Sequence, residues 1–141
     1  MRRKLVYRYY CDYCKKAGCS GWHMKNHELH CTMNPNRDCR VCDLIGAAQV
    51  PISDLIAVLP DPTLLLQYDT GPDGEDQGQH WEDWGVDAAI EKLREMTEHC
   101  PACIMAALRQ AGIPVPLAST FRFKKEMEDV WSDINARNGD L

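Results

Sequence analysis

The spacing of the cysteines constrains this chain more than any other feature. Six of its eight cysteines form three C-x2-C pairs, in which one tight turn presents two sulfur atoms to a common partner. Secreted disulfide scaffolds spread their cysteines along the chain, whereas metal sites pair them in this way. A thioredoxin-type redox motif needs a βαβ context, which none of the pairs has. The pattern therefore predicts metal binding. The pairs are Cys11–Cys14, Cys39–Cys42 and Cys100–Cys103.

The first pair has two further candidate ligands nearby. His27 follows Cys14 after twelve residues, and Cys31 follows His27 after three more. Residues 20–31 read as a helix with Ser20 as its N-cap, so His27 and Cys31 are expected one turn apart on one face. A turn that carries two thiolates and a helix that carries these two side chains can surround one tetrahedral ion. His30 competes with Cys31 for the fourth position, and the spacing favours Cys31.

This C-x2-C-x12-H-x3-C pattern resembles the two-cysteine, two-histidine zinc finger, with cysteine as the last ligand. The resemblance covers residues 9–34 and implies a ββα-like unit around a structural zinc ion. It departs from the family at Gly18, where the family has a core phenylalanine. The whole chain also resembles small uncharacterised zinc-finger proteins of tailed bacteriophages, a likeness that implies no activity. By analogy with fingers that read DNA, Trp22, His23 and Asn26 would face a groove, and Lys15, Lys16 and Lys25 would contact phosphates.

The other two pairs have no partners except each other. Joined, Cys39, Cys42, Cys100 and Cys103 make a four-cysteine site across 57 intervening residues. Closing a loop of this length costs about 4 kcal/mol plus a constant. A structural zinc ion contributes about 10–16 kcal/mol, so the metal outweighs that cost. We therefore predict two structural zinc ions. Replacement of one ligand by His99, or exchange of ligands between the two sites, is the alternative.

Charge is unevenly distributed along the chain. Residues 1–42 contain nine Lys or Arg against three acidic residues, a net charge of +6, and the total of −5 leaves −11 for the remainder. This asymmetry suggests an anionic partner for the N-terminal part, with attraction between the two halves of the molecule as the alternative. We predict nucleic-acid binding through residues 1–42. The candidate residues are Arg2, Arg3, Lys4, Lys15, Lys16, Trp22, His23, Lys25 and Asn26.

The remaining patterns predict a mainly α-helical, zinc-stapled small domain with a small N-terminal β-hairpin. We expect a basic finger-like module at residues 1–35, a helical region closed by the four-cysteine site at 36–113, and a spacer with an amphipathic helix at 114–141. Residues 69–80 are rich in Gly, Asp and Pro and predict a mobile acidic loop. The expected helices are 53–59, capped by Ser53, 86–99, 101–110 with Pro101 in its first turn, and 122–137.

A catalytic role is the minority interpretation. His80 and Glu82 followed by Cys100-x2-Cys103 resemble the H-x-E…P-C-x-x-C pattern of zinc nucleobase deaminases. The proline lies inside this cysteine pair instead of before it, and such a site would leave Cys39 and Cys42 without partners. The chain also lacks the convincing His-Asn-His set that a zinc-dependent nuclease would need. A catalytic zinc also needs an open coordination position, whereas both predicted sites have four protein ligands. We therefore expect a protein that is not an enzyme.

The alternative function is a protein–protein adaptor or assembly component. Five apolar residues of the predicted helix 122–137 share one face, which could pack on the protein's own core or bind a partner protein. The acidic remainder of the chain would add to such a surface. No apolar run is long enough to span a membrane, and no signal peptide follows the basic start, so we expect an intracellular protein, in the host cytoplasm if viral. The apolar residues are Phe123, Met127, Val130, Trp131 and Ile134.

Overall fold

The computed structural model describes residues 1–139, so the last two residues of the predicted C-terminal region lie outside it. In this range seven α-helices, one 3-10 turn and two antiparallel hairpins confirm the mainly α-helical class with a small N-terminal hairpin. In chain order the elements are β1 (Tyr9–Tyr10), β2 (Ala17–Gly18), α1 (Gly21–His30), α2 (Arg40–Ile45), α3 (Ile52–Ile56), α4 (Pro62–Leu65), β3 (Leu66–Thr70), β4 (Asp76–Trp81), α5 (Val86–Thr97), α6 (Pro101–Ala111), η1 (Val115–Leu117) and α7 (Phe123–Gly139).

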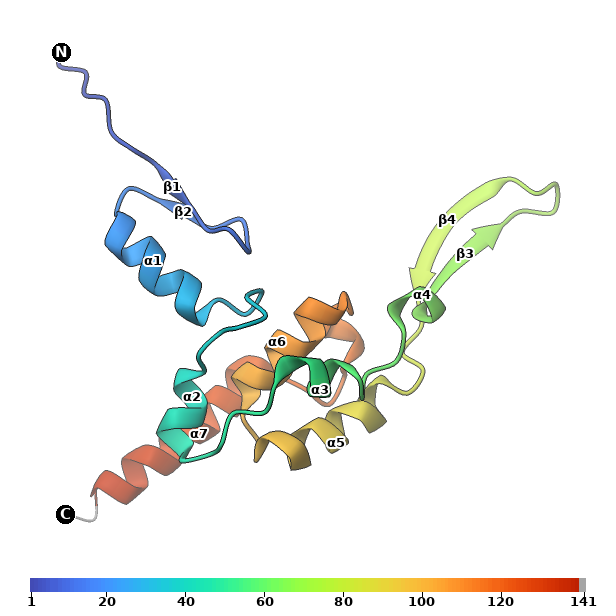
Figure 1. Ribbon diagram of the computed structural model, residues 1–141. Coiled ribbons are helices and arrows are strands. Elements are labelled where there is room, and N and C mark those ends of the chain that lie inside the picture. The colour runs from blue at the N-terminus through green and yellow to red at the C-terminus, as the bar shows by residue number, and fades with distance from the viewer. Residues whose placement is uncertain (140–141) are drawn as a thin grey trace.

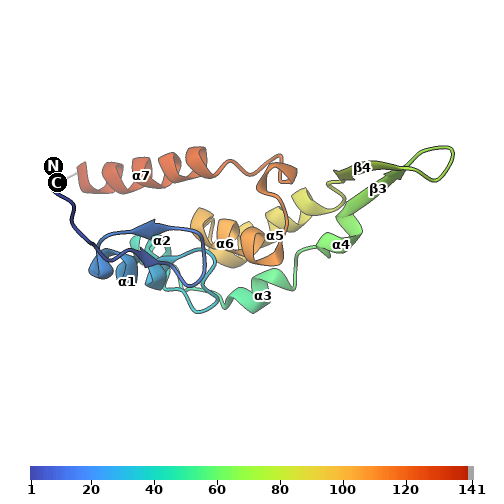
Figure 2. The same cartoon turned by 90° about the horizontal axis from the view of Figure 1, so that it is seen from above.

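The molecule is elongated, and the chain runs out to the β3–β4 hairpin and returns through α5, α6 and α7 (Figures 1 and 2). β1, β2 and α1 lie at one end, and the β3–β4 hairpin projects from the other. Helices α3, α5 and α6 lie between these ends, and α7 runs beside them. The exposed N-terminal tail, residues 1–8, extends away from the body. The basic and acidic segments of the sequence are thus separated in space as well as along the chain.

The β1–β2 hairpin and α1 form the expected ββα-like unit. The hydroxyl of Ser20 caps α1 by accepting a hydrogen bond from the His23 amide at 3.3 Å, as predicted. Tyr9 pairs with Gly18 across the hairpin. Its ring lies over Gly21, where an added Cβ would come within 3.2 Å of the ring, so glycine permits this close packing. Met24 on α1 is buried beneath the hairpin's cysteines.

The central helix α6 contributes more buried residues than any other helix of the described chain. Ile104, Ala107 and Leu108 are fully buried at helical spacing, and α5 and α3 pack against this helix. Ile90 of α5 and Leu55 of α3 are also completely buried. Burial of each such large aliphatic side chain stabilises the fold by about 1.5–3 kcal/mol. Within the part of the chain that the structure describes, no helix combines the length and apolar character needed to cross a membrane.

The prediction that residues 86–99 form one helix is wrong at its C-terminal end. Helix α5 ends at Thr97, and the next two residues, Glu98 and His99, have positive φ angles of 54° and 63°. The His99 amide donates to the carbonyl of Arg94 at 2.9 Å, which closes the helix end in the left-handed manner. This reversal places Cys100 as the N-cap of α6, whose first residue is Pro101, as predicted.

The predicted helix 53–59 is displaced and shorter in the structure. Helix α3 begins at Ile52 and ends at Ile56, so Ser53 lies inside the helix and is not its cap. The N-cap is Pro51, whose carbonyl accepts hydrogen bonds from the amides of Asp54 and Leu55 at 3.1 and 3.4 Å. Proline can occupy the cap because a helix makes no intrahelical bond with the amide at that position.

The prediction of a mobile loop over residues 69–80 is also wrong. Most of this segment belongs to β3 and β4, in which Leu66 pairs with Trp81 and Gln67 with His80. At the tip, the Gly71 amide donates to the carbonyl of Glu75 at 2.7 Å, and Gly74 adopts a φ of 77°. Gly, Asp and Pro residues that indicate a loop are also those that build the turn of a hairpin.

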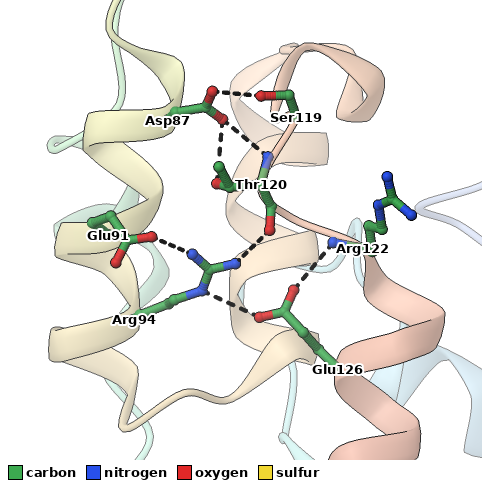
Figure 3. A network of polar contacts seen from close by, with 7 residues as sticks. All are labelled: Asp87, Glu91, Arg94, Ser119, Thr120, Arg122 and Glu126. Atoms are coloured by element: carbon green, nitrogen blue, oxygen red, sulfur yellow. Dashed lines mark hydrogen bonds and ion pairs between the residues drawn. The ribbon is translucent and has the colours of Figure 1, made fainter.

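A polar network fastens α7 to α5 (Figure 3). The guanidinium of Arg94 donates to the Glu126 carboxylate at 3.2 Å and to the Thr120 carbonyl at 2.8 Å, and it also pairs with Glu91. Asp87 accepts from the hydroxyl of Ser119 at 2.6 Å, and this bond lowers the pKa of its carboxyl group. The network matters because α7 has no fully buried side chain of its own in the described residues.

The first prediction concerns pH and the β3–β4 hairpin. Hydrogen bonds to Asp69 and Glu82, at 2.9 and 3.0 Å, raise the pKa of His80. Because the pKa is raised in the folded hairpin, protonated His80 stabilises it below the ordinary histidine pKa, and this contribution is lost as pH rises through the folded value. An NMR titration should give a midpoint above the ordinary value, and Asp69→Asn should lower it. A His80 midpoint at the ordinary histidine value that is the same in Asp69→Asn would contradict the contact.

The second prediction concerns the attachment of α7. Arg94→Met should lower the free energy of unfolding by about 2 kcal/mol, because the Glu126 carboxylate would lose a charged hydrogen-bond partner. Urea unfolding of metal-replete protein, followed by far-ultraviolet circular dichroism, measures the change. Lys92→Met on the same helix is the control, since this exposed residue should change stability by less than about 0.5 kcal/mol. Equal effects of the two substitutions would rule out the network as the anchor.

Candidate metal centres

The structure brings Cys11, Cys14, His27 and Cys31 together, with their ligand atoms all within 4.8 Å of one another. Cys11 and Cys14 flank the turn between β1 and β2, while His27 and Cys31 come from the C-terminal end of α1. The Sγ atom of Cys14 lies 3.3 Å from Nε2 of His27. Ligands at zinc–sulfur and zinc–nitrogen bond lengths of about 2.3 and 2.0 Å around a tetrahedron have comparable separations. This first centre is therefore positioned to bind a metal ion.

Backbone amides support the sulfur atoms of the first centre. The amides of Tyr13 and Lys16 point at the Sγ atoms of Cys11 and Cys14, each at 3.4 Å. Burial opposes ionisation of Cys14, but hydrogen bonds from the Lys16 amide and the neighbouring thiols outweigh it and lower its pKa. Burial, aided by the charge of Lys16, also lowers the pKa of His27 and favours the neutral imidazole that binds metals. Both effects prepare the centre for a cation.

Of the two candidates for the fourth ligand, the structure places Cys31 in the cluster. Cys31 is buried, and His30 points elsewhere: its Nδ1 atom is 2.7 Å from the backbone carbonyl of Asp38. Cys31 also ends α1, because its amide donates to the Glu28 carbonyl at 3.4 Å. This helix end turns the thiol towards the hairpin.

The four remaining paired cysteines form the second centre. Sγ of Cys39 lies 3.6 Å from that of Cys100, and Sγ of Cys42 lies 3.4 Å from that of Cys103. All four ligand atoms are within 4.8 Å of one another, and none of the residues is more than 1% exposed. Each pair starts a helix, with Cys39 as the N-cap of α2 and Cys100 as the N-cap of α6. The second centre is thus built from two matching helix starts.

Contacts within the second centre shift the pKa values of its thiols in opposite directions. Hydrogen bonds from the thiols of Cys100 and Cys103 lower the pKa of Cys39 far below its ordinary value. Burial raises the pKa of Cys42, and hydrogen bonds with Cys103 and Cys39 raise that of Cys100. A divalent cation would supply the positive charge that four thiolates in so small a space require.

The segment between the two centres is tied to α6. The side-chain amide of Gln110 donates to the carbonyls of Thr32 and Asn34 at 2.7 and 3.1 Å, and the guanidinium of Arg109 donates to the Thr32 hydroxyl at 2.7 Å. The amide of Asp38 donates to the Leu29 carbonyl at 2.8 Å. These contacts fix the finger-like unit beside the second centre.

The candidate nucleic-acid residues occupy three neighbouring places. Arg2, Arg3 and Lys4 lie in the exposed tail, Lys15 and Lys16 follow the first cysteine pair, and the others lie on α1. A surface cleft of about 410 Å³ brings three of them together with two histidines that the sequence singled out as candidate metal ligands, and it adds Arg40. Trp22 and Lys25 line a shallower neighbouring hollow with Asn26. The cleft is lined by Lys16, His23, Asn26, His27, His30 and Arg40.

The deaminase-like pattern is not assembled in the structure. Cys100 and Cys103 group with Cys39 and Cys42, while His80 lies on the projecting hairpin with Asp69 and Glu82. Two functional candidates escaped the sequence analysis: Arg37, buried beside the second centre, and Arg40, which lines the cleft. In the sequence, these two arginines stand out only because they lie within two residues of Cys39. That position does not reveal where a long side chain points.

The fold and the two clusters define a small helical protein with two thiol-rich sites that are positioned to bind metal. Comparison of the chain with protein-family models, curated protein sequences and solved structures gives no match. The likeness of residues 9–34 to a zinc finger therefore depends on the ligand spacing and the geometry of the first centre. The likeness to bacteriophage proteins stays a prediction.

The third prediction is the metal stoichiometry. Native mass spectrometry should find two divalent ions bound to the wild-type chain and one bound to Cys39→Ser/Cys100→Ser, because serine is a poor replacement for a thiolate ligand. Cys31→Ser should likewise retain only one tightly bound ion. The matched controls, Cys19→Ser and His30→Ala, should keep two ions, since neither residue belongs to a cluster. One ion in the wild type, or two in the double variant, would overturn the two-centre arrangement.

Proposed function

We propose that this protein is a zinc-stapled binding module that contacts nucleic acid through its basic N-terminal part, with both ions structural and without catalytic activity. One observation supports this proposal above the others. The cleft on α1 is lined by two cationic side chains, three histidines and an amide, and by no carboxylate. Hydrogen-bond donors and positive charge without acidic neighbours suit the phosphodiester backbone.

The chemistry of the donor atoms supports zinc as the metal. One cluster offers four thiolates, and the other offers three thiolates and one imidazole. Soft sulfur ligands in closed tetrahedral sets are typical of structural zinc, and the mixed set with one histidine is a common zinc arrangement. Four protein ligands leave no open position for water or substrate, which is why we propose a structural role.

The distribution of charge supports an anionic partner. The tail and the first centre expose Arg2, Arg3, Lys4, Lys15 and Lys16 to solvent. No Lys or Arg occurs between Arg40 and Lys92, so the basic residues of this half do not continue into the acidic hairpin. Such a localised positive surface attracts polyanions, whereas the acidic remainder of the molecule repels them.

Exposed aromatic side chains among these cations favour a single-stranded ligand. Tyr7, Tyr10 and Trp22 are 84, 65 and 72% exposed. Bases of any nucleic-acid sequence can stack on such rings, and each stacked base stabilises the complex by about 1–3 kcal/mol. A lone finger reads only about three base pairs of duplex, too few for useful specificity without further contacts. Stacking and phosphate contacts together are therefore a better match to this surface.

A protein adaptor is the second candidate, because α7 keeps part of its apolar face uncovered. Phe123 and Trp131 are 36 and 48% exposed, whereas Met127, Val130 and Ile134 are half-buried. A partner protein could cover the exposed part of this face. The basic cleft makes nucleic acid the better-supported proposal, since an adaptor surface on α7 would not require it.

The fourth prediction tests the cleft. Fluorescence anisotropy with a labelled single-stranded oligonucleotide should show binding that weakens as salt increases. Lys16→Ala/Arg40→Ala should weaken binding and reduce the slope of log K against log salt by roughly 1.4, because two phosphate contacts are lost. Lys124→Ala/Lys125→Ala removes the same charge from exposed positions on α7 and is the matched control. Binding that is absent, independent of salt or equally weakened by both variants would contradict nucleic-acid recognition by the cleft.

A further inference from the structure

Arg37 is a buried cation directed at the second centre. It lies in the segment between α1 and α2, only 7% of its surface is exposed, and its Nη1 atom is 3.6 Å from Sγ of Cys103. Its backbone is fixed on both sides, because its amide donates to the Asn34 carbonyl at 3.3 Å and its carbonyl accepts from the Gln49 side chain at 2.7 Å. The same Gln49 side chain accepts from the Cys39 amide at 2.7 Å. The position of the guanidinium is thus coupled to a ligand residue.

The guanidinium lacks the partner that a buried charge requires. Its Nε atom has no hydrogen-bond partner, and no carboxylate forms an ion pair with Arg37 within residues 1–139. Burial of an unpaired charge is costly, and arginine cannot escape the cost by losing its proton. The nearby groups that can carry negative charge are the cysteine sulfurs. Arg37 therefore indicates that the second centre is anionic in the folded protein.

We infer that Arg37 is the counter-charge of the second centre and sets how tightly this centre holds its ion. The inference rests on the proposed metal binding. Four thiolates and one divalent ion carry a net charge of −2, and the fixed charge of Arg37 reduces it to −1. N–H groups directed at sulfur also stabilise the negative charge that remains on each thiolate. Neutral thiols or disulfides would offer the guanidinium no such anion.

The inference assigns Arg37 a positioning role and no part in coordination. Removal of an outer-shell partner that orients and charges a metal ligand typically lowers metal affinity 10- to 100-fold. If Arg37 only packed its aliphatic stem against the core, methionine could replace it without such a loss of metal affinity. A measurement of the electronic state of the sulfur atoms therefore distinguishes a counter-charge from a packing residue. Loss of packing alone would leave that state unchanged.

The fifth prediction compares Arg37→Met with the wild type by two measurements. Transfer of metal to a chromogenic chelator should show two phases in the wild type, and Arg37→Met should accelerate one of them by about 10- to 100-fold. In cobalt-substituted protein, the sulfur-to-cobalt charge-transfer band should move to lower energy, because an N–H group no longer stabilises the sulfur lone pairs. Arg37→Lys, which keeps the charge without the planar donor geometry, should give an intermediate rate.

Arg109→Met is the matched control, because Arg109 holds the same segment through Thr32 but does not touch the second centre. It should leave unchanged both the band and the release phase that Arg37→Met accelerates. If Arg37→Met fails to fold, the intermediate rate and the displaced band of Arg37→Lys carry the test. Wild-type rates and spectra in both Arg37 variants, with two ions bound, would overturn the role of Arg37 alone. A wild-type protein that binds no metal would overturn both the inference and the proposed function.

Discussion

The convergence of Cys39, Cys42, Cys100 and Cys103 is the constraint on which the rest of the fold depends. These thiols lie in the same buried cluster as the apolar side chains of α3, α5 and α6, so the metal centre and the hydrophobic core are one continuous structure. Both cysteine pairs also start helices, α2 and α6. An ion held here would therefore fix two helix starts and close a long loop of the chain at once.

Local spacing predicted those parts of the structure that depend on a single turn of chain. The C-x2-C pairs, the placement of His27 and Cys31 on one helix, the Ser20 cap and the start of α6 at Pro101 all follow from neighbours a few residues apart. Loop closure by four equivalent thiols could be predicted as well, because no other partners were available. These are cases in which the local chemistry allows few alternatives.

Other features depend on contacts that the sequence does not show. The left-handed residues Glu98 and His99 shorten α5 because Cys100 has to turn back into the second centre, which local helix preference does not register. The Gly- and Asp-rich segment became the β3–β4 hairpin, since its composition suits a turn as well as a loop. The burial of Arg37 is a tertiary fact, because an arginine in a basic stretch is usually a surface residue.

The arrangement of the two centres gives the basic surface its shape. The cleft is lined by Lys16 and α1 on one side and by Arg40 on the other, and Arg40 stands between the ligands Cys39 and Cys42. Its guanidinium donates to the Asn26 side chain of α1 at 3.2 Å, which joins the two sides of the cleft. Arg37 lies in the intervening segment and faces the second centre from within. The same short stretch of chain thus provides a buried charge that balances the thiolates and an exposed charge that completes the cleft. Under the proposed function, residues 37–42 would couple metal binding to recognition of an anion, because they provide both second-centre cysteines and cleft-lining Arg40.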